Sequence, residues 1–136
     1  MDEEPLNKPD QISWVLASHD PSRLAAFYSR LLNRDAAPGW SATHWVIDLA
    51  ESLSLEIYRP SRQRPFPDRG RHLAPCLRLK ASADPLTHLQ GMLPHWLAAG
   101  ASIAESPRLE SFGAECWLLD PEENAVLVVV PAVSKR

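Results

Sequence analysis

The sequence predicts an α+β domain built from two tandem βαβββ modules, and three observations support this prediction. The first is that Ala17-Ser18-His19-Asp20-Pro21 recurs as Ala81-Ser82-Ala83-Asp84-Pro85, each time between a strand-like and a helix-like run. The second is that Trp45-Val46-Ile47-Asp48 is similar to Trp117-Leu118-Leu119-Asp120, and each precedes an apolar run that ends in proline. The third is the length of 136 residues, which suits one domain. A repeat on this scale indicates two similar units related by a pseudo-twofold axis.

The first module is expected over residues 12–60. Its first strand, 12–18, is rich in isoleucine, tryptophan and valine. Asp20-Pro21 begins a helix, because aspartate caps helices and proline is tolerated at their first position. Apolar residues spaced by three and four extend that helix to Asn33. Strands are expected at 40–49 and 53–58, the second alternating between two different faces.

The second module is expected over residues 74–131. Its predicted elements are a strand, a helix and three further strands, at 76–80, 84–99, 102–109, 114–119 and 125–130. Pro94 should kink or split the helix, and Gly100 should end it. The rest of the chain is assigned to an N-terminal tail, an Arg/Pro-rich linker and a C-terminal tail, at 1–11, 61–73 and 132–136.

Composition argues against several classes of partner. The formal net charge of −3 provides no general attraction to nucleic acid or to an anionic membrane. No apolar run approaches the roughly 20 residues needed to span a bilayer, and the acidic N-terminus does not resemble a leader, so we expect a cytoplasmic protein. Cys76 and Cys116 are not spaced as a metal or redox pair, so both are expected to be reduced and buried.

The order of elements, the aspartate that starts each helix and the turn Asp120-Pro121-Glu122-Glu123-Asn124 resemble the vicinal oxygen chelate superfamily. This superfamily includes glyoxalase I, bleomycin-resistance proteins, fosfomycin-resistance enzymes and extradiol dioxygenases. The resemblance covers residues 12–131, and Glu123 replaces the glycine usual in that turn. It implies curved mixed sheets around a cavity for a small organic ligand. It also implies a homodimer, because such proteins often complete their cavities across a twofold axis.

Enzymes of the superfamily usually bind one divalent metal through residues of both modules. The resemblance places the four ligand positions at Ser13, Glu56, Ala74 and Leu127. Only Glu56 is a good ligand, whereas a catalytic site normally needs about three protein ligands. We therefore predict no metal and no other cofactor. A displaced metal site remains an alternative, made of Glu56, His72 and His44.

Glu56 stands among leucine, isoleucine and tyrosine, where an unpaired carboxylate would cost several kcal/mol. Arg78 is its expected partner, and the two residues are either ligand anchors or a structural ion pair. Trp40 follows Pro38-Gly39 and is expected at the mouth of a pocket. Trp45 and Trp117 are expected to share one orientation because of the repeat. The complete set of predicted ligand-binding residues is Glu56, Arg78, Ser13, Tyr58, Trp40, Trp45, Trp117 and Leu127.

The function expected from these observations is the binding of a small molecule by a glyoxalase/bleomycin-resistance-like protein without the usual metal site. One alternative is a lyase, isomerase or dioxygenase-like enzyme, with an altered metal site or with Glu56 as a proton-transfer base and thus as the catalytic candidate. Another is a non-catalytic adaptor that dimerises through strand edges. Neither nucleic acid nor membrane is an expected partner.

Overall fold

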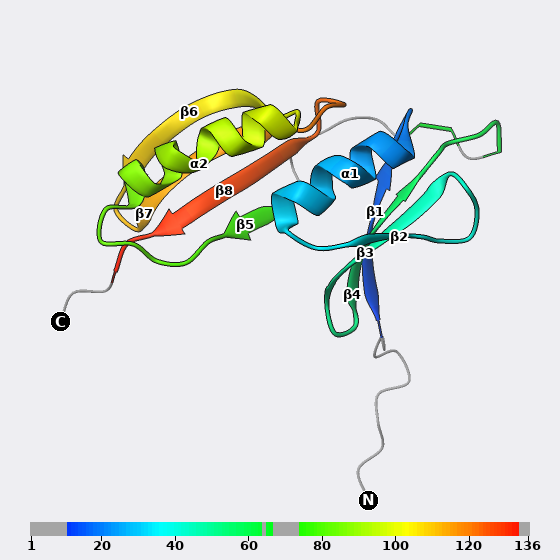
Figure 1. The fold of residues 1–136 in the computed structure, drawn as a ribbon, viewed down its shortest axis with the longest axis horizontal. Helices are drawn as coiled ribbons and strands as arrows, with labels where there is room; N and C mark the ends of the chain where they lie inside the picture. The colour runs from blue at the N-terminus through cyan, green and yellow to red at the C-terminus, as the bar shows by residue number, and fades with distance from the viewer. Residues whose placement is uncertain (1–10, 64, 67–73, 134–136) are drawn as a thin grey trace, which may run out of the picture. The chain divides into compact units, whose positions relative to one another are not determined.

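The structure is a computed structural model that describes residues 11–63, 65–66 and 74–133. The chain divides into two compact units, Met1–Phe66 and Pro67–Arg136 (Figure 1). The elements of the first unit are β1 (Ile12–Ala17), α1 (Pro21–Leu32), β2 (Ala36–Pro38), β3 (His44–Ala50) and β4 (Leu53–Tyr58). Those of the second are β5 (Cys76–Arg78), α2 (Pro85–Ala99), β6 (Ser102–Glu110), β7 (Gly113–Leu119) and β8 (Ala125–Pro131). The predicted repeat of a βαβββ module is confirmed.

Each unit contains one mixed sheet, and the two sheets have the same topology. Their strand orders are β1-β4-β3-β2 and β5-β8-β7-β6. The first strand of each unit pairs parallel with the last, and the remaining pairs are antiparallel. The predicted α+β class is therefore confirmed, while the cavity stays a prediction. No helix in the described ranges is long and apolar enough to cross a membrane.

A hydrogen-bonded junction connects the first strand to the helix in the first unit. The Ser18 N–H donates to the Tyr58 carbonyl oxygen at 2.9 Å, which extends the β1–β4 pairing beyond the strand. The Ser18 hydroxyl oxygen accepts from the Asp20 N–H at 3.0 Å, and the Asp20 carboxylate accepts from the Arg23 N–H at 3.4 Å. The same serine thus ends the strand and orients the residue that caps α1.

The second unit repeats this junction with the same atoms. Ser82 donates its N–H to the Pro131 carbonyl oxygen at 2.9 Å and accepts from the Asp84 N–H at 3.1 Å. The Asp84 carboxylate then accepts from the Thr87 N–H at 3.4 Å. The recurrence of Ser-x-Asp-Pro in the sequence is therefore explained by one local structure formed twice.

The helices cover one face of each sheet. In the first unit α1 contacts β3 and β4, and Ile47 and Ile57, both 0% exposed, lie on the same sheet face. In the second unit α2 lies over β7 and β8 (Figure 1), and the alternate residues Cys116, Leu118, Val126, Val128 and Val130 are buried. Because side chains alternate along a strand, the residues between these face away from the helix.

Three local expectations are wrong in whole or in part. The strand expected at residues 40–49 begins only at His44, because residues 39–44 form a turn closed by the Gly39 N–H and the His44 carbonyl oxygen at 2.6 Å. Pro94 does not split α2, since it is exposed and water can solvate the carbonyl that loses its partner, and a kink at Pro94 stays a prediction. Cys76 is exposed on β5, whereas Cys116 is buried as expected.

The turn before β8 holds a residue in a strained backbone conformation. Asp120 is 2% exposed, and its carboxylate accepts from the N–H groups of Glu122 and Asn124 at 2.8 and 2.9 Å. This arrangement places Glu123 at φ 69°, in the left-handed region that favours glycine.

We predict that Glu123→Gly raises the free energy of unfolding by about 0.5–1 kcal/mol in a urea titration. Glu122→Gly is the control and should lower it, because Glu122 has an ordinary φ. Equal stability of Glu123→Gly and the parent chain would contradict this account.

Burial, with a smaller contribution from Glu115, raises the pKa of the Cys116 thiol from 9.0 to about 11. Between pH 9 and 11 the unfolded chain loses the thiol proton and the folded chain keeps it, so stability falls as pH rises. The loss attributable to this thiol is about 2–3 kcal/mol. Denaturation across this range should show a shallower alkaline decline for Cys116→Ala, whereas the exposed control Cys76→Ala should follow the parent chain. An unchanged decline in Cys116→Ala is the contrary result.

Candidate functional site

Glu56 of β4 and His44 of β3 form a pair on one face of the first sheet. The register places Glu56 opposite Val46 and His44 opposite Tyr58, so both side chains leave the same face. Glu56 Oε1 lies 3.0 Å from His44 Nε2, and the two side chains are 27% and 13% exposed. Ile47 and Ile57 point to the other face, toward α1. Glu56 and His44 therefore belong to the face that no described element of this unit covers, which we call the open face.

The loop before β3 sets the hydrogen-bonding roles of His44. The backbone N–H of Trp40 donates to His44 Nδ1 at 2.8 Å. An Nδ1 that accepts this bond holds no proton, so the neutral ring holds its proton on Nε2 and donates it to Glu56. The Glu56 carboxylate is thus oriented by an imidazole that is itself oriented by the Trp40 backbone.

Gly39 is needed for this arrangement. A Cβ atom at residue 39 would lie 2.1 Å from His44 Nδ1 and 2.6 Å from Cε1, far inside van der Waals contact. The imidazole therefore packs directly against the Gly39 backbone. In the sequence Pro38-Gly39 indicates a turn, but nothing in the sequence shows that this glycine accommodates a histidine five residues later.

Several other predicted ligand-binding residues share the open face with Glu56. Ser13 of β1 lies opposite Ser54, and their hydroxyl oxygens are 2.9 Å apart. Tyr58 lies directly opposite His44. Trp40 is 93% exposed in the loop before β3, consistent with an accessible position. The first unit thus brings together four of the predicted residues, Glu56, Ser13, Tyr58 and Trp40, with His44.

Trp45 and Trp117 do not share one orientation, so that expectation is wrong. Trp45 lies opposite Ile57 on the face toward α1, and its buried Nε1 has no hydrogen-bond partner among the described residues. Trp117 lies opposite Leu127, away from the buried Cys116 and Leu118. The register explains the difference. Tyr58 and Pro131 are equivalent, because each accepts the N–H of the junction serine. Tyr58 pairs with His44, which Trp45 follows, whereas Pro131 pairs with Gly113, which Ala114 follows, so Ala114 and not Trp117 is the equivalent of Trp45.

The same register revises the equivalent positions of the two units. Glu56 lies two residues before Tyr58, so its counterpart is Val129, two residues before Pro131, and not Leu127. Ser13 pairs with Ser54, whose counterpart four residues before Pro131 is Leu127, and Leu127 pairs with Cys76, so Cys76 replaces Ala74 as the counterpart of Ser13. Val129 cannot bind a metal, whereas a thiol such as that of the exposed Cys76 can.

The described donors do not fit a catalytic divalent metal. Within residues 11–63, 65–66 and 74–133, no group of three His, Cys, Asp or Glu side chains could hold a metal ion. Both ring nitrogens of His44 have partners, so it can ligate only by losing Trp40 or Glu56. His72, the third member of the displaced site, lies outside the described residues. The absence of a metal stays a prediction.

The second unit carries the remaining predicted residues. Arg78 is exposed on β5 opposite Val129, and Leu127 is half-buried. The described partner of Glu56 is His44, and pairing of Glu56 with Arg78 stays a prediction.

Near the β6–β7 hairpin, Arg108 binds the carboxylates of Glu105, Glu110 and Glu115 at 3.3, 2.9 and 2.5 Å. The hydrogen bond to Glu115 raises the pKa of Arg108, and this contact links β6 to β7, whereas Glu105 and Glu110 lie on β6 itself.

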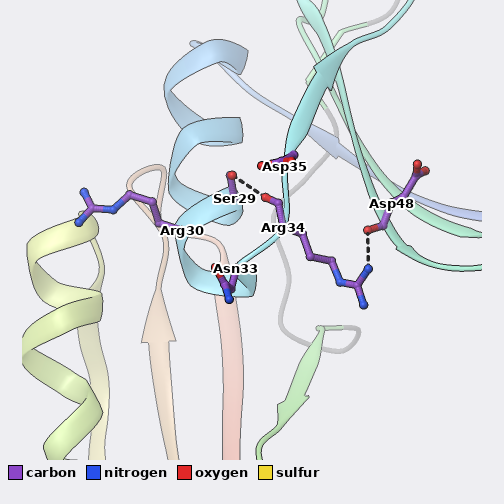
Figure 2. Close-up of a pocket in the computed structure, with 6 residues that line it drawn as sticks. All are labelled: Ser29, Arg30, Asn33, Arg34, Asp35 and Asp48. Carbon is purple, nitrogen blue, oxygen red and sulfur yellow. Dashed lines mark hydrogen bonds between the residues drawn. The ribbon is translucent and has the colours of Figure 1, made fainter.

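A polar depression of about 550 Å³ lies at the C-terminal end of α1 (Figure 2). Its lining residues are Ser29, Arg30, Asn33, Arg34, Asp35 and Asp48. The Ser29 hydroxyl donates to the Arg34 carbonyl oxygen, and Arg34 Nη1 donates to the Asp48 carbonyl oxygen at 3.4 Å. Figure 2 shows Arg30 and Arg34 extending in opposite directions, so they do not converge on one anion. None of the predicted ligand-binding residues lines this depression.

The contact between Gly39 and His44 leads to a prediction. Gly39→Ala should displace the imidazole, break the bond from Trp40 and lower the free energy of unfolding by about 1–3 kcal/mol. Gly91→Ala is a matched control, because a Cβ there meets nothing within 4 Å. Gly91 lies inside α2, so alanine should stabilise by about 0.5–1 kcal/mol. Urea denaturation measures both variants, and a Gly39→Ala protein as stable as the parent would refute the close packing.

No protein-family model matches the sequence, and no curated protein matches it either. Solved structures do match. An Agrobacterium tumefaciens protein has a TM-score of 0.67 and 20% identity, over 93% of this chain and 99% of its own. A glyoxalase/bleomycin resistance protein/dioxygenase family enzyme from Burkholderia phytofirmans has a TM-score of 0.64 and 16% identity, over 85% and 94%. A glyoxalase/bleomycin resistance protein from Albidiferax ferrireducens has a TM-score of 0.65 and 14% identity, over 87% and 95%.

The likeness to these structures agrees with the fold that the strand order defines, and at identities of 20% or less it concerns the fold alone. The predicted resemblance is confirmed at that level. The chain therefore has the fold of glyoxalase/bleomycin resistance/dioxygenase proteins, the vicinal oxygen chelate superfamily.

Proposed function

We propose that this chain is a small-molecule binding protein without a catalytic divalent metal, and that Glu56 anchors its ligand on the open face of the first sheet. One observation carries the proposal. Glu56 is held by His44 through one oxygen, and its second oxygen has no hydrogen-bond partner among the described residues. A partly buried carboxylate with one oriented and one available oxygen is suited to bind a hydrogen-bond donor.

Rigidity around this carboxylate supports the proposal. His44 is held by the Trp40 N–H and packed against Gly39, while the Ser13 and Ser54 hydroxyls bond to each other nearby on the same face. Groups that are fixed before binding lose less conformational entropy when the ligand arrives. The open face therefore offers a prearranged polar anchor.

The donor set favours metal-independent binding. The positions equivalent to Glu56 and Ser13 in the second unit are Val129 and Cys76, of which only Cys76 has a ligating side chain, and His44 already uses both nitrogens. A typical catalytic site would need about three ligands with an open position. The described residues of the first unit supply Glu56 and, after rearrangement, His44, and no group of three ligands exists in the described ranges.

The alternative of a metal-free enzyme has one observation in its favour. A carboxylate paired with an imidazole is a common proton-transfer arrangement, and Glu56 is the group with an available oxygen. In such an enzyme Glu56 would accept a proton from a bound substrate while His44 holds its other oxygen. The adaptor alternative, the homodimer and the cytoplasmic location stay predictions.

Analysis of the natively purified protein tests the proposal. We expect mass spectrometry to find an organic molecule at up to one equivalent per chain, and elemental analysis to find no stoichiometric manganese, iron, nickel or zinc. Added metal should leave the melting temperature unchanged, whereas a ligand at 100 times its Kd would contribute about 2.7 kcal/mol. Glu56→Gln should lose the molecule, and the exposed control Glu51→Gln should retain it.

The contrary outcomes point to the alternatives. A stoichiometric divalent metal that Glu56→Gln removes would replace this proposal with a metalloenzyme. A protein that carries no organic molecule and gains no thermal stability from any compound in a broad metabolite library would favour the adaptor.

A further inference from the structure

The strands of the first sheet carry negative charge only, and they carry it on one face. Its four strands contain two acidic residues, Asp48 and Glu56, and neither lysine nor arginine. Both acidic residues lie on the open face, because Asp48 pairs with Ser54 and Glu56 with Val46. Arg34 reaches the Asp48 backbone at 3.4 Å, so positive charge is already present near Asp48. Glu56 is consequently the carboxylate of this face best placed to attract an added cation.

Apolar surface flanks Glu56 on both neighbouring strands. The register places Val15 of β1 and Val46 of β3 directly beside Glu56 on the open face. Val15 is 61% exposed, although valine on a strand usually packs against neighbours. A ligand anchored at Glu56 would therefore rest on aliphatic side chains rather than on further polar groups.

Trp40 adds an exposed aromatic surface next to the same pair. Its side chain is 93% exposed, while its backbone N–H is fixed 2.8 Å from His44 Nδ1. The turn that carries it is closed by the Gly39 and His44 backbones. An exposed tryptophan is a frequent contact for flat rings and for organic cations, which the indole face attracts.

From this arrangement we propose that the ligand of the open face is an organic cation with a flat apolar body. Its ammonium or amidinium group donates to the available oxygen of Glu56, and its body covers Val15 and Val46 beside Trp40. This inference rests on the proposed small-molecule function and specifies the chemical class of the ligand. The face would reject the matching anion, since Glu56 and Asp48 repel it.

Three nearly isosteric probes test the inference on the parent chain: benzamidine, benzamide and benzoate. At neutral pH they present a cation, a neutral amide and an anion on the same ring. Titrations followed by calorimetry and by indole N–H NMR signals should give a Kd for benzamidine at least about tenfold below that for benzamide, a difference of about 1.4 kcal/mol. Benzoate should not bind at millimolar concentration.

Variants locate the effect. Glu56→Gln keeps an oxygen for the His44 Nε2–H, so the fold should persist while the preference for benzamidine over benzamide disappears. Trp40→Ala should weaken both probes together. The controls are Glu51→Gln and Trp14→Ala, which remove an exposed carboxylate and a partly exposed indole on the other face, and neither should change binding.

The outcomes separate this inference from the function on which it rests. Equal binding of benzamidine and benzamide, or a preference for benzoate, overturns the cationic class but leaves a small-molecule site. A benzamidine preference that survives Glu56→Gln overturns Glu56 as the anchor. If none of the three probes binds, the inference fails, and the search for a co-purified molecule decides the broader proposal separately.

Discussion

The junction between the first strand and the helix is the constraint on which each unit depends. In both units one serine ends the parallel pairing with the last strand and accepts the N–H of the aspartate that caps the helix. The first strand, the helix and the last strand are thereby connected through one short segment of the chain. A change in this junction would shift the pairing of the first and last strands, and a shift of one residue would exchange the two faces of the first strand.

In each unit the helix packs on one face of the sheet, and the two units carry different side chains on the other face. In the first unit it presents a carboxylate, an imidazole and two hydroxyl groups in fixed contact. In the second unit the counterpart of Glu56 is Val129, and the counterpart of His44 is Gly113, which lies opposite Pro131. The shared backbone thus carries different polar groups in the two copies, Glu56 with His44 in the first and Arg108 with Glu115 in the second, because the side chains have diverged while the hydrogen-bonded framework has not.

The polar site depends on close contacts that have a cost for the fold. Gly39 is required where the imidazole meets the backbone, and the Trp40 indole is left exposed. Exposure of a large aromatic side chain forgoes the stabilisation that burial would give it. Such features are expected where a surface is shaped for binding, since they add nothing to the core.

The sequence by itself determined the fold class, the βαβββ repeat and both helix caps, because these follow from local patterns of spacing and capping. It also singled out Glu56, whose role stays a prediction. The sequence did not identify His44 as the partner of Glu56, and it did not show that Trp45 and Trp117 lie on non-equivalent faces of their sheets. Both depend on which residues face each other across strands. Only the tertiary structure decides this register, because side chains alternate along a strand and the similar Trp45 and Trp117 segments occupy different places in it.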